Sequence, residues 1–209
     1  MSPRYFLPDA LRQRAGSKLR LGIYGGTFDP VHHGHLIVAA DAVEELRLDY
    51  VLFIPCAISP HKRGVRSASG AHRAAMLQKA LRRCGGERFL LSQMELTREG
   101  VSYSVDTAAY LATELPKASL YWLIGADQLP KLHTWFELER LQRLVTFAVM
   151  NRGEAKPALP KGCLWLKRER RIDIGATEIR RRVREGKPFE QLVPAAVAAY
   201  IHANELYRA

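Results

Sequence analysis

The chain has 209 residues, 47% of them hydrophobic, and a formal net charge of +11 from 32 Lys and Arg against 21 Asp and Glu. A chain of this length can bury a core without disulfides or metal ions, so we expect one compact globular domain with at most a small appendage. The positive charge indicates an anionic partner, whether nucleotide phosphates, nucleic acid or an acidic membrane surface, and charge alone does not choose among them.

The sequence shows no sign of export or of membrane insertion. No apolar stretch approaches the roughly 18 residues that a spanning helix needs, and residues 1–18 lack the apolar core of a signal peptide. The three cysteines are odd in number and far apart, so they fit neither a disulfide framework nor a pair of zinc ligands. We therefore expect a cytoplasmic protein in a reducing compartment, without a membrane partner.

Residues 1–18 predict a basic N-terminal extension that could be flexible, followed by a single domain over residues 19–209. Within that domain, apolar runs predict strands at residues 19–24, 50–55, 88–93, 119–125, 145–150 and 163–167. Segments of helical period lie between them, at residues 35–46, 71–83, 104–115 and 136–144. Because helices alternate with strands that are apolar on both faces, the pattern predicts an α/β fold, a Rossmann-like doubly wound parallel sheet. Such sheets bind ligands at the carboxyl ends of their strands.

Two more helix patterns follow the last predicted strand, at residues 179–184 and 194–207. Together they predict a small C-terminal helical appendage, from residue 175 to residue 209. We expect the two long loops, residues 56–70 and 151–162, to be mobile, and the first is basic and long enough to close over a ligand.

The first predicted strand runs directly into an unusual sequence, LGIYGGTFDPVHHGHL at residues 21–36. Gly25 and Gly26 lack side chains, so the backbone there can approach a bulky anion. The helix that follows offers free N–H groups and the positive end of its dipole. His32 and His35 are three residues apart, so on one helical turn they face the same way. Two imidazoles with backbone donors could hold a triphosphate.

Simpler explanations compete with this interpretation. A Gly-Gly pair after a strand is often only a turn, and a single His is more often packed or solvated than catalytic. A metal site built from His32, His33 and His35 would lack a distant further ligand, so we expect no protein-held metal. The whole string nevertheless contains the pattern T-x-x-x-x-H-x-G-H, which ends in His32, Gly34 and His35, and with it the chain resembles the nucleotidylyltransferase superfamily.

Four further pieces of sequence extend this resemblance from about residue 19 to residue 209. Three of them indicate one branch: SPHK at 59–62, MELTREGVSYSVDT at 94–107 and LIGADQLPKLHTWFELERL at 123–141. The fourth, IGATEIRRRV at 174–183, is a second superfamily signature. The chain is thereby similar to the bacterial nicotinate-nucleotide adenylyltransferases. It departs from them at Gly175 and Ala176, where the family has hydroxyl residues.

The resemblance implies that ATP and nicotinate mononucleotide react, with Mg²⁺, to give nicotinate adenine dinucleotide and pyrophosphate in NAD biosynthesis. Because the attacking phosphate is already ionised, we expect catalysis by positioning and charge neutralisation, without a general base. The expected catalytic residues are His35, His32 and Arg180. The expected ATP and phosphate contacts are Gly25, Gly26, Thr27, Phe28, Gly34, Thr177 and Ile179. The expected acceptor contacts are Ser104, Asp127, Trp135, Phe136, His61 and Lys62.

The acceptor side leaves alternatives open. The resemblance implies that an aromatic ring near Trp135 stacks on the pyridine, with backbone N–H groups around Ser104 and Phe136 on its carboxylate. Packing in the core is the alternative for Trp135, and it is the favoured explanation for Trp122 and Trp165. For the loop residues His61 and Lys62 the alternative is simple solvation.

Two other functions compete with this expectation. Another nucleotidylyltransferase, such as a pantetheine-phosphate adenylyltransferase or a cytidylyltransferase, would share the first motif but not the SYSVDT and GADQLPKLHTW pieces. A nucleic-acid-binding protein on an α/β scaffold would explain the charge, but no nucleic-acid module is recognisable. We therefore expect no nucleic-acid partner, and homo-oligomerisation stays open.

Overall fold

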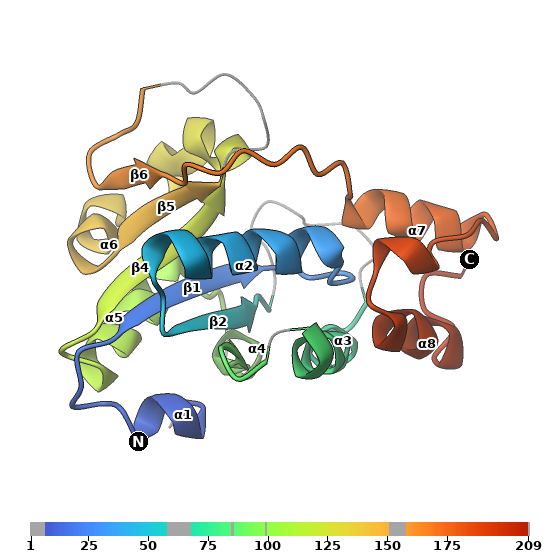
Figure 1. The fold of residues 1–209 in the computed structure, drawn as a ribbon, viewed down its shortest axis with the longest axis horizontal. Coiled ribbons are helices and arrows are strands. Elements are labelled where there is room, and N and C mark those ends of the chain that lie inside the picture. Colours follow the sequence, from blue (N-terminus) through green and yellow to red (C-terminus); the bar gives the residue numbers. More distant parts are fainter. Residues whose placement is uncertain (1–6, 58–67, 85, 99, 151–157, 209) are drawn as a thin grey trace.

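In the computed structural model, which describes residues 7–57, 68–84, 86–98, 100–150 and 158–208, six parallel strands form one sheet (Figure 1). They are β1 (Arg20–Gly26), β2 (Tyr50–Pro55), β3 (Phe89–Leu91), β4 (Ser119–Gly125), β5 (Thr146–Met150) and β6 (Cys163–Trp165). Their order is β3-β2-β1-β4-β5-β6. The winding reverses at β1, which has β2 on one side and β4 on the other, so the predicted doubly wound Rossmann-like sheet is confirmed.

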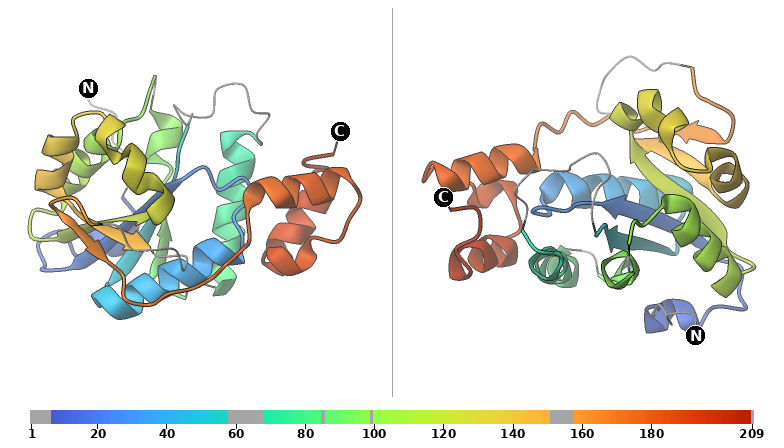
Figure 2. Two further views of the ribbon diagram at one scale, coloured as in Figure 1. Left: turned by 90° about the horizontal axis from the view of Figure 1, so that it is seen from above. Right: turned by 180° about the vertical axis from the view of Figure 1, so that it is seen from behind.

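The strands are apolar on both faces because helices cover both faces (Figure 2). Along β2, Val51 and Phe53 belong to the core on one face, whereas Leu52 and Ile54 belong to the core on the other, and all four side chains are fully buried. The first core includes α2 (His33–Leu46) and α3 (Gly70–Cys84), and the second includes α5 (Ser104–Glu114) and α6 (Leu138–Leu144). These are the four helices that the helical periods predict.

The remaining helices on the sheet are short and were not predicted. They are α1 (Asp9–Arg12), α4 (Met94–Thr97) and the 3₁₀ helix η1 (Ala126–Thr134). One turn of helix cannot establish a period of 3.6 residues, and η1 contains Pro130, which a sequence pattern treats as a break. Among the described residues, no helix combines the length and the apolar character required to cross a membrane.

The C-terminal part continues the main core. It contains α7 (Ala176–Arg184), the 3₁₀ turn η2 (Glu190–Leu192) and α8 (Ala195–Ala203), which lie together beyond the arrowheads of β1 and β2 (Figure 1). Ile179, Phe189, Val197 and Ile201 are buried in the same cluster as the side chains of α2 and α3. The helical appendage is therefore fixed at the carboxyl edge of the sheet.

A crevice opens at this edge between β1 and β4. Pairing of β1 with β4 ends at Ile23 and Trp122, whereas pairing of β1 with β2 continues to Gly26 and Pro55. The last residues of β1 therefore have a neighbouring strand on one side only. Parallel sheets bind ligands at such a switch point, so the topology already selects this edge.

The described part of the expected N-terminal extension packs on the sheet. Leu7 and Leu11 are buried in the second core, at 3% and 0% exposure. The Arg14 guanidinium lies 2.9 Å from the Asp49 carboxylate, which also accepts the Arg20 N–H at 2.7 Å. The division of the chain at residue 18 stays a prediction. The two loops expected to be mobile fall largely outside the described residues.

Replacing Leu11 by Ala is expected to lower the free energy of unfolding by about 2–5 kcal/mol, because it empties a fully buried site between α1 and the sheet. Urea denaturation measures this change. The control is Gln13→Ala, an exposed position at the end of the same turn, which should stay within about 0.5 kcal/mol of the parent chain. Equal stability of both variants would show that this segment is not docked on the core.

Candidate functional site

The chain turns sharply between β1 and α2, at the edge where the crevice opens. Phe28 adopts φ 50°, in the left-handed region that residues with side chains seldom occupy, and the Asp29–Pro30 peptide is cis. The Phe28 ring is buried at 2% exposure, 5.5 Å from the Tyr24 ring and 5.0 Å from the His35 ring, centroid to centroid. The turn therefore packs its one aromatic side chain inward and directs its backbone to the crevice.

His32 and His35 stack on each other at the start of α2. Their ring centroids are 3.7 Å apart, and the backbone N–H of His32 donates to Nδ1 of His35 at 3.2 Å. The prediction that the two imidazoles face the same way is confirmed. Because Nδ1 of His35 accepts a hydrogen bond, the ring carries its proton on Nε2, which makes Nε2 a donor.

Gly34 is required for this stacking. A Cβ at this position would lie 3.0 Å from Nδ1 of His32 and 3.2 Å from Cγ2 of Ile172. A Cβ here would push the His32 ring or the Ile172 side chain away by a few tenths of an ångström. The glycine of the H-x-G-H pattern thus has a steric reason in this chain.

Arg180 reaches the same turn from α7, 151 residues further along the chain. Its Nη1 donates to the backbone carbonyl of Asp29 at 2.6 Å, and its Nη2 donates to Oγ1 of Thr177 at 3.3 Å. Gly175 precedes the helix and makes no side-chain cap, as its replacement of a hydroxyl residue suggests. The structure therefore brings together His32, His35, Thr177 and Arg180.

A buried arginine holds the turn from behind. Arg73 on α3 is 3% exposed and donates to three backbone carbonyls: Thr27 at 2.8 Å, Ala68 at 3.1 Å and Ala57 at 3.2 Å. Thr27 follows β1, Ala57 follows β2 and Ala68 precedes α3, so Arg73 ties three parts of the chain together. Sequence reasoning gave Arg73 no role, because it lies among the apolar positions of its helix.

A cavity of about 330 Å³ occupies the crevice and adjoins the turn. Its volume is within the range of small-molecule sites. Eight of the sixteen residues expected at the site line it: Gly25, Gly26, Thr27, Phe28, His35, Ser104, Asp127 and Trp135. His32, Gly34, Thr177 and Arg180 are not among its wall residues. Residues expected to bind ATP and residues expected to bind the acceptor therefore share one cavity.

Two further expected contacts, Phe136 and Ile179, also lie outside the cavity wall. The Phe136 side chain is 51% exposed and does not line the cavity, and its ring lies 4.4 Å from the Tyr103 ring on the surface. The Ile179 side chain is fully buried in the core, and its N–H bonds to the carbonyl of Gly175. Ile179 thus supports α7 by packing. His61 and Lys62 lie outside the described residues.

Trp135 combines the two roles that the sequence left open. Its ring packs edge-on against Trp122, at 6.3 Å between centroids, and against Phe147 at 5.8 Å, yet it also lines the cavity. Trp122 is 3% exposed, so the prediction that it packs in the core is confirmed, although it too borders the cavity. Trp165 is only partly buried, on the edge strand β6.

Sequence reasoning missed several polar residues of the cavity wall: Cys56, Glu95, Ser102 and Gln128. Glu95 is the most unusual, since it is 6% exposed and accepts a hydrogen bond from Oγ1 of Thr107 at 2.9 Å. Burial raises the pKa of Glu95 to about 7, because the hydrogen bond and the charge of Arg98 only partly offset the lost solvation. The one sequence signal that could have indicated Glu95 as a site residue was its place within the MELTREG piece.

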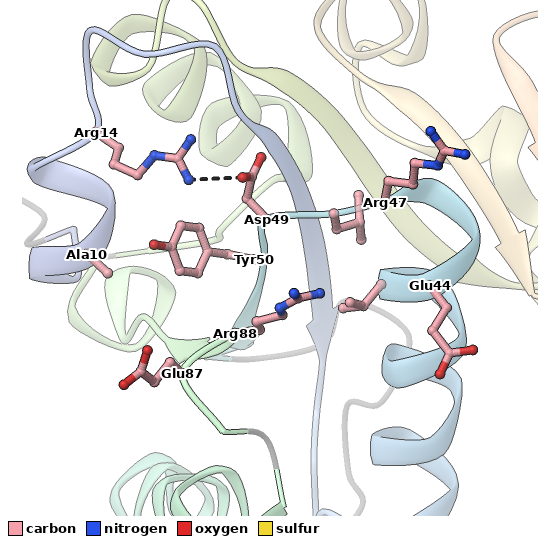
Figure 3. A pocket seen from close by; sticks show the side chains of 10 residues that line it. Ala10, Arg14, Glu44, Arg47, Asp49, Tyr50, Glu87 and Arg88 are labelled. Carbon is pink, nitrogen blue, oxygen red and sulfur yellow. Dashed lines mark hydrogen bonds and ion pairs between the residues drawn. The ribbon is translucent and has the colours of Figure 1, made fainter.

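A larger cavity, of about 720 Å³, lies at the amino end of β2 (Figure 3). Three arginines and three acidic residues line it, and the Arg14–Asp49 ion pair crosses it. Arg14, Arg47 and Arg88 balance Glu44, Asp49 and Glu87, and none of the described residues expected to bind ATP or the acceptor is in its wall. No glycine is among its described wall residues, and it lies away from the carboxyl edge of the sheet. The smaller cavity at the carboxyl edge is the better candidate despite its size.

Comparison with known proteins identifies the family of the chain. The sequence profile of the cytidylyltransferase-like family matches residues 23–182, a span that begins in β1 and ends in α7. The fold and the turn indicate an α/β protein of the nucleotidylyltransferase class, and the match to the family profile identifies the same class from the sequence.

Curated relatives match over almost the whole chain. A probable nicotinate-nucleotide adenylyltransferase of Opitutus terrae is 39% identical over 194 residues, which cover 91% of this chain and 98% of the relative. One of Thermomicrobium roseum is 42% identical over 198 residues, covering 90% and 92%. This chain belongs to the cytidylyltransferase-like family and, within it, to the nicotinate-nucleotide adenylyltransferases.

A solved structure shows the same fold at lower identity. Plasmodium falciparum nicotinic acid mononucleotide adenylyltransferase, complexed with NaAD, superposes with a TM-score of 0.76 at 20% identity. The match covers 90% of this chain and 97% of the other.

Replacing Glu95 by Gln should change how stability depends on pH. In the parent chain the folded state holds the proton of Glu95 up to a pH of about 7, whereas the unfolded chain loses it near 4.5. Raising the pH from 5 to 8 should therefore lower the free energy of unfolding of the parent relative to Glu95→Gln, by on the order of 3 kcal/mol.

Urea denaturation at several pH values measures this difference. The Gln side chain can still accept the hydrogen bond of Thr107, so packing is matched. Glu114→Gln, at an exposed position of α5, serves as the control and should follow the parent at every pH. Parallel pH profiles for the parent and Glu95→Gln would contradict a raised pKa.

Proposed function

We propose that this chain transfers the adenylyl group of ATP to nicotinate mononucleotide, with release of pyrophosphate, and so forms nicotinate adenine dinucleotide for NAD biosynthesis. The observation that carries the proposal is the shared cavity, whose walls include His35 and the glycine turn together with Ser104 and Trp135. Phosphate donors and an aromatic ring in one cavity suit the joining of two nucleotides. The names of the curated relatives support the same reaction.

The reaction requires little covalent help from the protein. A phosphate oxygen of the acceptor attacks the α-phosphorus of ATP, a new P–O bond forms, and the bond to pyrophosphate breaks. No proton has to be removed from the attacking oxygen. The protein therefore accelerates the step by aligning the two phosphates and by neutralising the charge that builds on the leaving group.

The hydrogen-bond donors on the turn, on α2 and on α7 each have a role in this scheme. The Nε2 of His35 donates to the phosphate chain, and the stacked His32 fixes the orientation of the His35 ring. Arg180 and Thr177, already joined to each other at 3.3 Å, hold the leaving pyrophosphate. The glycine turn supplies backbone N–H groups and room for the triphosphate.

Mg²⁺ enters this scheme as part of the ATP substrate. In the part of the chain that the structure describes, no group of three or more His, Cys, Asp or Glu side chains could hold a metal ion. The phosphate oxygens of ATP would supply ligands of the ion, together with water. The protein side chains then act on the phosphates directly.

The acceptor occupies the part of the cavity between β4 and α5. The Trp135 ring stacks on the pyridine, and backbone N–H groups at Ser104, the first residue of α5, and at Phe136 bind its carboxylate. The exposed Phe136 side chain does not prevent a backbone contact. Asp127, whose Oδ2 accepts a 2.6 Å hydrogen bond from Gln128, is placed to bind a ribose hydroxyl. Donors aimed at a carboxylate would favour the acid over the amide.

Pyrophosphate release from ATP and Mg²⁺ tests the proposal, with nicotinate mononucleotide, nicotinamide mononucleotide and phosphopantetheine as acceptors in separate reactions. We expect turnover that strongly favours the nicotinate substrate. Preference for another acceptor would retain the phosphate chemistry and overturn the acceptor site. No turnover with any of the three would overturn the proposed reaction.

Replacing His35 by Ala should lower kcat by about 100- to 1000-fold, the usual loss when one positioned donor to a developing charge is removed. The affinity for ATP should change much less, because the donor acts mainly in the transition state. Steady-state kinetics measure both quantities. His33→Ala, at the first residue of α2, is the neighbouring control and should leave kcat close to the parent value. A near-normal kcat in His35→Ala would contradict its assignment.

A further inference from the structure

The C-terminal segment returns to the turn between β1 and α2. Glu205 and Tyr207 both adopt positive φ, at 49° and 65°, and these two bends bring the Tyr207 side chain back under the turn. The Tyr207 hydroxyl donates to Oδ1 of Asp29 at 2.7 Å, across 178 residues of sequence. The segment packs on the core through Leu206 and Tyr207, which are partly buried.

The Asp29 carboxylate is the meeting point of several parts of the chain. It is 3% exposed. Its Oδ1 accepts the Tyr207 hydroxyl and also the Ala68 N–H, at 3.1 Å. Its Oδ2 lies 3.7 Å from Nη1 of Arg180, which is beyond hydrogen-bond distance, and the same Nη1 donates instead to the Asp29 carbonyl.

This arrangement limits how strongly Asp29 holds Arg180. Two donors hold Oδ1, and both hydrogen bonds oppose a rotation of the carboxylate that would bring Oδ2 onto the guanidinium. A charge-assisted hydrogen bond between a carboxylate and a guanidinium would be short and strong, and it would draw Arg180 toward Asp29. As long as Oδ1 is fixed, one amino group of Arg180 stays tied to a carbonyl and the cation remains available to a phosphate.

Tyr207 is suited to this task at every pH at which the protein is expected to work. Burial, together with the negative charge of Asp29, raises the pKa of Tyr207 far above its ordinary value. The positive charges of Arg180 and Arg73 oppose this shift only in part. The hydroxyl therefore keeps its proton and remains a donor.

We propose that Tyr207 is a positioning residue for adenylyl transfer: by holding the Asp29 carboxylate it keeps the Arg180 guanidinium directed at the triphosphate. The inference rests on the proposed function of the site. It assigns to the C-terminal segment a part in nucleotide binding that packing alone would not require.

Replacing Tyr207 by Phe removes the hydroxyl and keeps the ring. The expected result is a loss of about tenfold in kcat/KM for ATP and a similar loss of affinity for a non-hydrolysable ATP analogue, with the KM of the acceptor unchanged. In an Arg180→Ala background the same replacement should cause no further loss, because its effect acts through Arg180. Calorimetry and steady-state kinetics provide these values.

The matched control is Tyr200→Phe on α8. The Tyr200 hydroxyl also makes a hydrogen bond within the C-terminal part, to Nδ1 of His72 at 3.0 Å, but it does not contact Asp29. This variant should bind the analogue and turn over as the parent does. Equal losses in Tyr200→Phe and Tyr207→Phe would overturn the proposal, since both would then report a loosened C-terminal part.

Two other outcomes would also overturn the proposal. One is an unchanged analogue affinity in Tyr207→Phe, and the other is a loss of the same size with and without Arg180. Failure of the proposed function is a separate result, in which the parent chain binds the analogue but transfers nothing to nicotinate mononucleotide. Calorimetry measures the affinity for the analogue without turnover, so it tests the role of Tyr207 even if the chain does not use nicotinate mononucleotide.

Discussion

A buried carboxylate at the turn after β1 is the constraint on which the rest of the site depends. Asp29 joins the first turn of the sheet to α7 through Arg180 and to the C-terminal segment through Tyr207. Arg73 secures the carbonyls around the same turn from α3. The carboxylate itself accepts hydrogen bonds from the Tyr207 hydroxyl and the Ala68 N–H, whereas Arg180 bonds the carbonyl of Asp29. A buried carboxylate requires donors of this kind, since an unpaired charge in the interior costs several kcal/mol or more. Satisfying this requirement brings together parts of the chain that are up to 178 residues apart.

The parallel sheet determines where this assembly lies. Because β1 leaves β4 after Ile23 while it still pairs with β2, the crevice opens beside the glycine turn. Every loop at the carboxyl edge can then contribute to one cavity, which explains why residues following β1, β2 and β4 line it together. The opposite edge holds a larger cavity, but its charges are balanced (Figure 3). The position at the switch point and the residues of the glycine turn, more than volume, therefore distinguish the two edges.

Sequence alone predicts the strands and the long helices. In the long helices the apolar period extends over several turns, and the strands are apolar runs with breaks between them. It also predicts the pairing of His32 with His35, which is a matter of spacing within one helical turn. It could not place Asp29 against Tyr207, because no local pattern records a contact across 178 residues. Arg73 was hidden among apolar positions, and Ile179, expected at the phosphates, is a core residue. One-turn helices such as α1 are too short to show a helical period in the sequence.

The central claim is that the nucleotide phosphates bind at the turn which Asp29 holds. The most direct measurement is a crystal structure of the chain with a non-hydrolysable ATP analogue and Mg²⁺. The account predicts phosphate oxygens within about 3.5 Å of Nε2 of His35 and of the Arg180 guanidinium, with Asp29 still bonded to Tyr207. Phosphates bound at the amino edge, among Arg14 and Arg88, or away from His35 altogether, would contradict it.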